Sequence, residues 1–261
     1  MLDSSKNSES GLNPVSLGIS GQSRSGKSAF LYHLLSSLEQ TGRVLVSGID
    51  PTGILLTPIS EMYQNIGKKS PFALGVNAEN FVLALERAVN LMLTRIELLT
   101  ASKKDKFSHF SAKFPMIYFV VEELGSVMEI LKNDDAVQGR KAGERKVDRF
   151  RSLLFMLISQ GAKVGCVAVL CAQQMRTDLL PSETRSNLQA KICLRQDHPD
   201  SIKMMAPWAS PEQVDWLMAQ SAGYALVATP DFQGIGQLHY LSYQDYLEQL
   251  EQLGVIRGLA P

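Results

Sequence analysis

The stretch ISGQSRSGKSAFLYHLL, from Ile19 to Leu35, decides the fold. Its middle part, GQSRSGKS at 21–28, matches the spacing G-x-x-x-x-G-K-[ST] of a phosphate-binding loop. The two glycines allow the backbone to turn so that successive N–H groups point at phosphate oxygens. We expect Lys27 to reach the β- and γ-phosphates and the Ser28 hydroxyl to bind Mg²⁺. The expected nucleotide-binding residues are Gly21, Gln22, Ser23, Arg24, Ser25, Gly26, Lys27 and Ser28.

The segments on either side of this loop support the match. The β-rich run VSLGIS at 15–20 precedes it, and AFLYHLLSSL at 29–38, of helical composition, follows it. The motif requires a strand, a glycine loop and a helix in this order, because the positive end of the helix then faces the same anion. A Ser/Gly surface loop that matches by chance is the alternative, and the flanking elements disfavour it. The sequence therefore predicts a nucleoside triphosphate site.

The composition of the chain limits the classes of protein to which it can belong. A chain of 261 residues fits one large α/β domain or two small ones. Lys+Arg and Asp+Glu number 26 each, so any nucleic-acid surface must be local. The isolated cysteines Cys166, Cys171 and Cys193 indicate buried thiols in a reducing compartment. Residues 1–13 are polar and predict a flexible leader, and no apolar run is long enough to span a membrane, which favours a soluble, cytoplasmic protein.

Strand and helix signals alternate after the leader, which predicts a mainly parallel central sheet with helices on both faces. Most strand candidates are continuous apolar runs, as expected for strands that are buried on both faces. They lie at 15–20, 43–49, 116–121, 164–171 and 190–195.

Helical spacing of apolar residues predicts helices at 78–100 and about 144–160, and SPEQVDWLMAQ opens another with a capping box. The runs 223–228 and 236–241 predict a C-terminal β-hairpin around the turn PDFQG. A final helix is expected at 243–253 and is expected to stop at Gly254.

Two polar signals stand at the ends of predicted strands. MIYFVVEEL, at 116–124, is an apolar strand that ends in two carboxylates, and parallel strand ends gather at the ligand edge of such sheets. We expect Glu122 to hold the Mg²⁺ shell and Glu123 to polarise the attacking water as the catalytic residue. Gln173 follows the next strand, where it is placed to sense the γ-phosphate. The alternatives are that both acids begin a solvated helix and that the glutamine faces solvent.

Several stretches together resemble the motor domain of the FtsK/SpoIIIE family of DNA translocases. They are GQSRSGKS, GIDPTGILLTPI at 48–59, VVEELGSVMEI at 120–130 and VLCAQQMRTDLLPSETRSNLQAKICLR at 169–195. The resemblance covers roughly residues 15–245. It implies a RecA-like P-loop NTPase fold with a C-terminal β-hairpin, a single motor domain at 14–261, ATP and Mg²⁺ as cofactors, and double-stranded DNA as substrate. It also implies a homo-oligomeric ring, with a hexamer as the expected state.

The chain departs from the family at two points of the site. The family usually has Asp-Glu where this chain has Glu122-Glu123, and the arginine that commonly precedes the fourth strand is absent. If a neighbouring subunit completes the site in trans, the candidates are Arg185, Lys191 and Arg195, and the sequence does not choose between them.

The densest basic run, at 132–151, follows the acidic strand and its helix. The equivalent connection in the family faces the ring channel and touches the duplex. Flexible basic side chains suit sequence-independent contact with phosphates. The alternative is an ordinary solvated surface. The expected DNA-binding residues are Arg140, Lys141, Arg145 and Lys146.

Three functions follow from these signals. The favoured one is an ATP-hydrolysing ring motor that translocates double-stranded DNA in plasmid or conjugative transfer or in chromosome-type pumping, with a membrane-anchoring or capsid partner in another chain. A viral genome-packaging ATPase is the rival within this class. A protein-secretion ATPase and a nucleotide-switched scaffold without turnover are the other two, and the last is motivated by the altered acidic pair.

Overall fold

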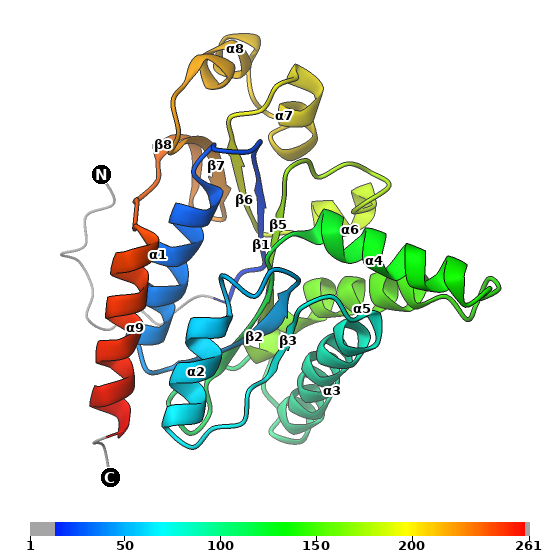
Figure 1. Ribbon diagram of the computed structural model, residues 1–261, viewed down its shortest axis with the longest axis vertical. Coiled ribbons are helices and arrows are strands. Elements are labelled where there is room, and N and C mark those ends of the chain that lie inside the picture. Colours follow the sequence, from blue (N-terminus) through cyan, green and yellow to red (C-terminus); the bar gives the residue numbers. More distant parts are fainter. Residues whose placement is uncertain (1–13, 259–261) are drawn as a thin grey trace.

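The computed structural model describes residues 14–258, so the predicted leader at 1–13 lies outside the described part of the chain (Figure 1). All strands in the described part belong to one eight-stranded sheet in the order β3-β2-β4-β5-β1-β6-β7-β8. The pairs from β3 to β6 are parallel, and β7 and β8 add an antiparallel hairpin at one edge. The strands are β1 Leu17–Ser20, β2 Val44–Asp50, β3 Phe72–Leu74, β4 Met116–Val121, β5 Cys166–Ala172, β6 Ala190–Leu194, β7 Tyr224–Thr229 and β8 Phe232–Gln237.

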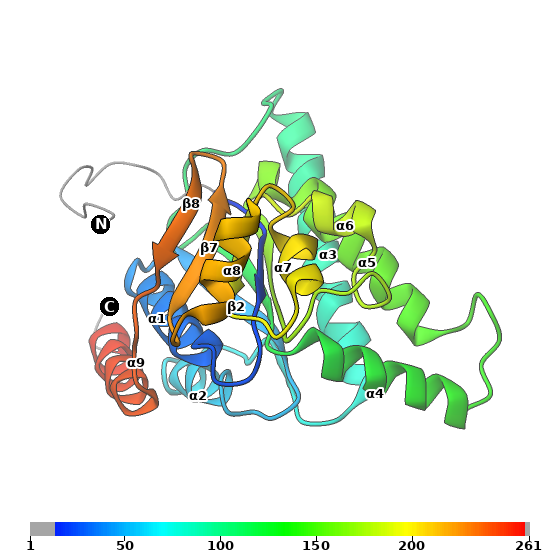
Figure 2. The same cartoon turned by 90° about the horizontal axis from the view of Figure 1, so that it is seen from above.

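Helices cover both faces of the sheet, which confirms the predicted α/β architecture (Figures 1 and 2). One face carries α1 Lys27–Gln40, α2 Thr57–Asn65 and α9 Tyr243–Gly258. The other carries α3 Ala78–Ala101, α4 Leu124–Val137, α5 Lys146–Gln160, α7 Pro199–Met205 and α8 Pro211–Ala219, with the short α6 Ser182–Ser186 beside α5.

Strand β4 shows why the apolar runs become central strands. Its six residues are all buried, and they alternate between the two cores: Phe119 and Val121 face the α3–α5 side, whereas Tyr118 and Val120 face the α1–α2 side. A strand with helices on both faces needs apolar residues at every position. The three cysteines are buried free thiols, as the sequence predicted. In residues 14–258 no helix is long and apolar enough to cross a membrane.

The second strand of the hairpin lies four residues earlier than the sequence predicted. Thr229 pairs directly with Phe232, so only Pro230 and Asp231 form the connection. The prediction took the whole of PDFQG as turn because it contains a proline and a glycine. Gly234 instead lies within β8, where the ring of Phe232 covers it.

The last helix does not stop at Gly254 but continues to Gly258. A Cβ atom at Gly254 would lie 3.4 Å from Cγ of Met62 in α2, an ordinary contact distance, so α9 packs against α2 at this point. Helix α9 is also fixed at both ends: the Tyr246 hydroxyl donates to the carbonyl of Leu55 at 2.9 Å, and Arg257 binds the buried carboxylate of Glu39 at 2.7 Å. These tertiary contacts offset the unfavourable helix propensity of glycine.

Candidate functional site

The phosphate loop lies between the end of β1 and the start of α1, and its backbone has the shape that the motif predicts. Gly26 has a φ of 101° and Arg24 a φ of 62°, both in the left-handed region. The carbonyl of Ser25 accepts a hydrogen bond from the Gly223 amide at 3.0 Å, and a Cβ at Gly26 would lie 3.0 Å from that same nitrogen. Gly223, the residue before β7, therefore packs against the phosphate loop. The sequence did not indicate this contact.

The strand order explains how the loop meets the acidic strand. Strand β5 lies between β4 and β1, with Val121 opposite Leu170 and Ala172 opposite Ser20. The carboxyl ends of these three parallel strands therefore share one edge of the sheet. Glu122 and Glu123 after β4, Gln173 after β5 and Gly21 after β1 all leave the sheet there.

Lys27 is the first residue of α1, and its Nζ donates to the carbonyl of Gly21. Burial lowers the pKa of this ammonium, whereas the nearby Glu123, Cys171 and Glu122 oppose that shift. The positive charge of Lys27 therefore interacts with the carboxylates of Glu122 and Glu123, although β5 lies between β1 and β4. The structure brings together the lysine and the acidic pair that the sequence predicted to share a site.

Glu122 and Glu123 occupy different surroundings. Burial, then repulsion from Asp50 and Glu123, raises the pKa of Glu122 from 4.5 to about 7, although Lys27 opposes this. Burial also raises the pKa of Glu123, and Lys27 and the backbone amides of Gln173 and Gly125 oppose the shift. Oε1 of Glu123 accepts from the Gln173 amide at 3.3 Å. Glu123 is therefore held toward β5, the strand next to the phosphate loop.

Gln173 has a fixed backbone and an exposed side chain. Its carbonyl accepts from the Gly21 amide at 3.2 Å and from the side chain of Gln196 at 3.0 Å, and its own amide binds Glu123. Gln196 is 2% exposed and was not identified from the sequence, because it follows β6 without any motif. Beside Glu123 and Gln173 lies a cavity of about 520 Å³, which is also lined by Glu129, Arg176 and Asp178.

Asp50 is a third acid at this edge, but it has a structural role. It is fully buried, and its two carboxylate oxygens accept from the backbone amides of Thr52, Gly53, Leu55 and Leu56 and from the Thr52 hydroxyl, at 2.8–3.0 Å. These bonds fold the loop between β2 and α2. The part of GIDPTGILLTPI that carries the family resemblance is thus a loop built around one carboxylate.

The residues present fit a magnesium–nucleotide complex. A Cβ at Gly21 would lie 2.5 Å from the Ser25 hydroxyl, so the turn accepts only glycine there. Ser28 lies in the first turn of α1, where helix N–H groups favour an anion. In residues 14–258 no group of three or more acidic, His or Cys side chains could hold a metal ion. Mg²⁺ commonly binds through one or two protein oxygens plus phosphates, and the Ser28 hydroxyl and the Glu122 carboxylate are side-chain oxygens of the type that such a site uses.

The three candidates for action in trans are engaged within their own chain to different degrees. Arg185 donates from Nη1 to the carbonyl of Met175 at 2.6 Å, in the segment that follows Gln173. Arg195 donates to the carbonyl of Gln220 at 3.1 Å, and its own carbonyl accepts from the Gln22 amide in the phosphate loop. Lys191 is the second residue of β6, toward the opposite end of the strand from the site edge, and burial lowers its pKa.

The basic residues between α4 and α5 divide into two pairs. Arg140 binds Asp134 and Asp135, at 2.5 and 3.0 Å, and Lys146 binds Asp134 and Glu79, at 3.2 and 2.7 Å. Lys141 and Arg145 are exposed, and within residues 14–258 neither forms an ion pair. In both overall views the loop stands out from the body at the far end of α4 (Figures 1 and 2).

Comparison with known proteins agrees with this geometry. The chain is similar to the conjugation coupling protein TcpA of pCW3, solved with ATPγS, with a TM-score of 0.70 and 17% identity over 93% of this chain and 66% of that one. It is also similar to the Type VII secretion ATPase EccC of Thermomonospora curvata, with a TM-score of 0.63 and 17% identity over 93% of this chain and 27% of that one.

The genome-packaging NTPase B204 of Sulfolobus turreted icosahedral virus 2 matches with a TM-score of 0.51 and 12% identity, over 88% of this chain and 98% of that one. This chain shares its fold with these three proteins. The fold contains the mainly parallel RecA-like sheet that the sequence predicted. The chain spans about two thirds of TcpA and about a quarter of EccC. No known family model matches the sequence, and no curated protein is similar to it.

Proposed function

We propose that this chain is an ATP hydrolase that works as a ring motor and translocates double-stranded DNA. The observation that carries the hydrolase part is Glu123, which the Gln173 amide holds one strand away from the phosphate loop. Lys27 binds the β- and γ-phosphates. Ser28 and Glu122 would hold Mg²⁺, which would neutralise charge on the transferred phosphate. Glu123 takes a proton from the attacking water, and the exposed amide of Gln173 orients that water.

The DNA part of the proposal rests on the loop at 138–145. Among residues 14–258, Lys141 and Arg145 are exposed and form no ion pair, so they can meet phosphates without breaking one there. Arg140 and Lys146 support the loop from its base through their acidic partners. Similarity to a conjugation coupling protein also supports DNA as the substrate, and plasmid transfer is the process that this favours. A site completed by a neighbouring subunit, through Arg185 or Arg195, remains part of the proposal.

ATP turnover with and without duplex DNA tests the proposal. The wild-type protein should hydrolyse ATP, and duplex DNA should raise the rate. Glu123→Gln should bind ATP but lose turnover by about 10²- to 10⁴-fold, because the general base is removed while the phosphate contacts remain. Replacing Lys141 and Arg145 by Ala should remove the DNA stimulation and leave the basal rate intact. If Glu123→Gln turns over at the wild-type rate, the assignment of the base is wrong.

A protein-secretion ATPase is the second candidate, because the ATPases EccC and EssC match with TM-scores of 0.63 and 0.65. This function requires the same hydrolysis site but no contact with DNA. It predicts turnover that duplex DNA leaves unchanged and that the loop variant does not alter. The packaging NTPase B204 matches over nearly all of its own length, and a packaging motor would show the DNA stimulation of the first proposal.

A further inference from the structure

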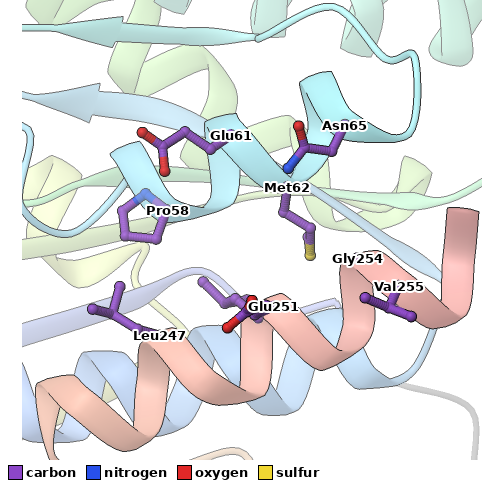
Figure 3. A pocket seen from close by; sticks show the side chains of 9 residues that line it. Pro58, Glu61, Met62, Asn65, Leu247, Glu251, Gly254 and Val255 are labelled. Atoms are coloured by element: carbon purple, nitrogen blue, oxygen red, sulfur yellow. The ribbon is translucent and has the colours of Figure 1, made fainter.

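A groove of about 490 Å³ runs between α2 and α9, on the face of the sheet that also carries α1 (Figures 1 and 3). Its floor is apolar: Met62 is 4% exposed and Leu250 is 2% exposed, and Pro58 and Leu247 line the same hollow. In Figure 3 the Met62 side chain points from α2 toward α9. None of these residues belongs to the nucleotide site.

Gly254 forms part of the hollow. It lies in the middle of α9, opposite Met62, and supplies no side chain to fill the space above the floor. The next residue, Val255, also lines the groove and is 60% exposed, so the groove has exposed apolar surface at its α9 rim. Exposed apolar surface beside an apolar hollow is typical of a site that another chain covers.

The rims of the groove are acidic. Glu61 from α2 and Glu251 from α9 both line it and are exposed (Figure 3). Within residues 14–258 neither carboxylate forms an ion pair. Arg257 is the one basic residue of the two helices, and its charge is paired with the buried Glu39 of α1. The chain as a whole is neutral, so this negative charge is a local feature.

We propose that the α2–α9 groove binds a basic amphipathic helix of a partner protein. Apolar side chains at i, i+3, i+4 and i+7 of that helix would fill the space above Met62 and Gly254. Its Lys or Arg side chains would meet Glu61 and Glu251. Helix α2 has nine residues and is about 13 Å long, so about two turns of the partner face it. A second copy of the chain fits less well through this face, because symmetric pairing brings the same acids together.

The groove lies outside the nucleotide site. Peptide binding to it therefore does not depend on the proposed motor function and can be measured without ATP.

A labelled synthetic peptide of about 15 residues, with Leu at helical spacing and Lys elsewhere, is the probe. Its binding to the full chain is measured by fluorescence anisotropy. The variant with both Glu61→Lys and Glu251→Lys should bind it at least about tenfold more weakly. Glu97→Lys, at an exposed position of α3, is the matched control and should bind as the wild type does.

A second peptide, in which Glu replaces every Lys, shows whether the charge-reversed variant is still folded. It should bind the charge-reversed variant more tightly than it binds the wild type. Gly254→Leu, which fills the hollow without changing charge, should weaken the Lys peptide as well. ATP binding should be the same in all these variants.

Three results would overturn the proposal. One is no binding of the Lys peptide to the wild type. Another is equal binding to the wild type and to the charge-reversed variant, since the contact would then lie elsewhere. The third is that the charge-reversed and Gly254→Leu variants lose self-association in sedimentation experiments, which would make a second copy the occupant of the groove.

Discussion

At the scale of single residues, the two adjacent glutamates differ in what surrounds them. Glu122 is close to Asp50 and Lys27, and the pKa of its carboxyl is raised to about 7. Glu123 is turned toward β5, where the Gln173 amide binds it. A carboxylate near a cation and a second acid suits a metal shell, and a carboxylate fixed by a backbone amide suits a directed base. The assignment of both roles is a proposal that kinetics can decide.

The raised pKa of Glu122 predicts how nucleotide-free stability depends on pH. The folded state holds the proton more tightly than the unfolded state, so the free energy of unfolding falls as pH rises from about 4.5 to about 7. The loss should be on the order of 1–2 kcal/mol after allowance for solvent screening. Glu122→Gln cannot ionise and should lack this part of the pH dependence.

Thermal unfolding of both proteins between pH 4.5 and pH 8 checks this. The advantage of Glu122→Gln over the wild type should grow through this range and level off above about pH 7. Parallel curves for the two proteins would contradict the assigned shift.

Lys27 carries a second prediction at this scale. Lys27→Ala should lower ATP affinity by at least about 100-fold, because it removes the ammonium group that lies at the start of the loop, on the Gly21 carbonyl, and that is expected to bind the β- and γ-phosphates. Isothermal titration calorimetry with a non-hydrolysable ATP analogue is the measurement. Lys163→Ala, in the turn between α5 and β5, is a control that should bind as the wild type does. Unchanged affinity of Lys27→Ala would remove the nucleotide site from this loop.

At the scale of elements, the connection from α4 to α5 is fixed at its base. Asp135 is 5% exposed and accepts from the amides of Lys146 and Val147, at 2.9 and 3.0 Å, and from Arg140 at 3.0 Å. It therefore caps the start of α5 from the last turn of α4. The neighbouring Asp134 binds Arg140 and Lys146 from a more exposed position.

These two aspartates should respond differently to truncation. Asp135→Ala should lower the free energy of unfolding by about 1–3 kcal/mol, because it leaves two buried amides of α5 without a partner. Asp134→Ala should lower it by less than about 1 kcal/mol, because its ion pairs are more exposed. Urea unfolding of the two variants beside the wild type gives both values. Equal losses would show that the backbone contacts of Asp135 contribute little.

At the scale of the whole molecule, strand order decides what the site contains. Strand β5 separates the phosphate-loop strand from the acidic strand, which places Gln173 between Gly21 and Glu123. The cavity beside Glu123 and Gln173 is also lined by Arg176 and Asp178. We expect a basic side chain of a neighbouring subunit to reach the site at this cavity.

A site that needs a neighbouring subunit makes hydrolysis depend on assembly. The specific ATPase activity should therefore rise steeply with protein concentration and fall toward zero where sedimentation shows monomer. Lys27→Ala subunits still carry Arg185 and Arg195, so adding them to dilute wild-type monomer should raise the wild-type activity. Specific activity that stays constant on dilution to monomer would exclude completion in trans.

The chemistry of the nucleotide site and the class of fold can be predicted from the sequence alone. The phosphate loop, the apolar strand before Glu122 and the alternation of strands and helices are signals that short segments carry, because spacing and burial on both faces leave a periodic pattern. These signals predict the parallel sheet, the edge that gathers Lys27, Glu123 and Gln173, and the buried thiols.

Contacts between segments that are distant in sequence are visible in the tertiary structure alone. The support of Gly26 by Gly223, the anchoring of Gln173 by Gln196 and the pairing of Arg140 with Asp135 join groups that no motif connects. Helix α9 passes Gly254 because packing against Met62 outweighs local propensity. Local helix and strand preferences contribute about 1 kcal/mol per residue. Contacts that bury apolar surface or satisfy a buried charge contribute more. Tertiary packing therefore determines the structure wherever it disagrees with local preference.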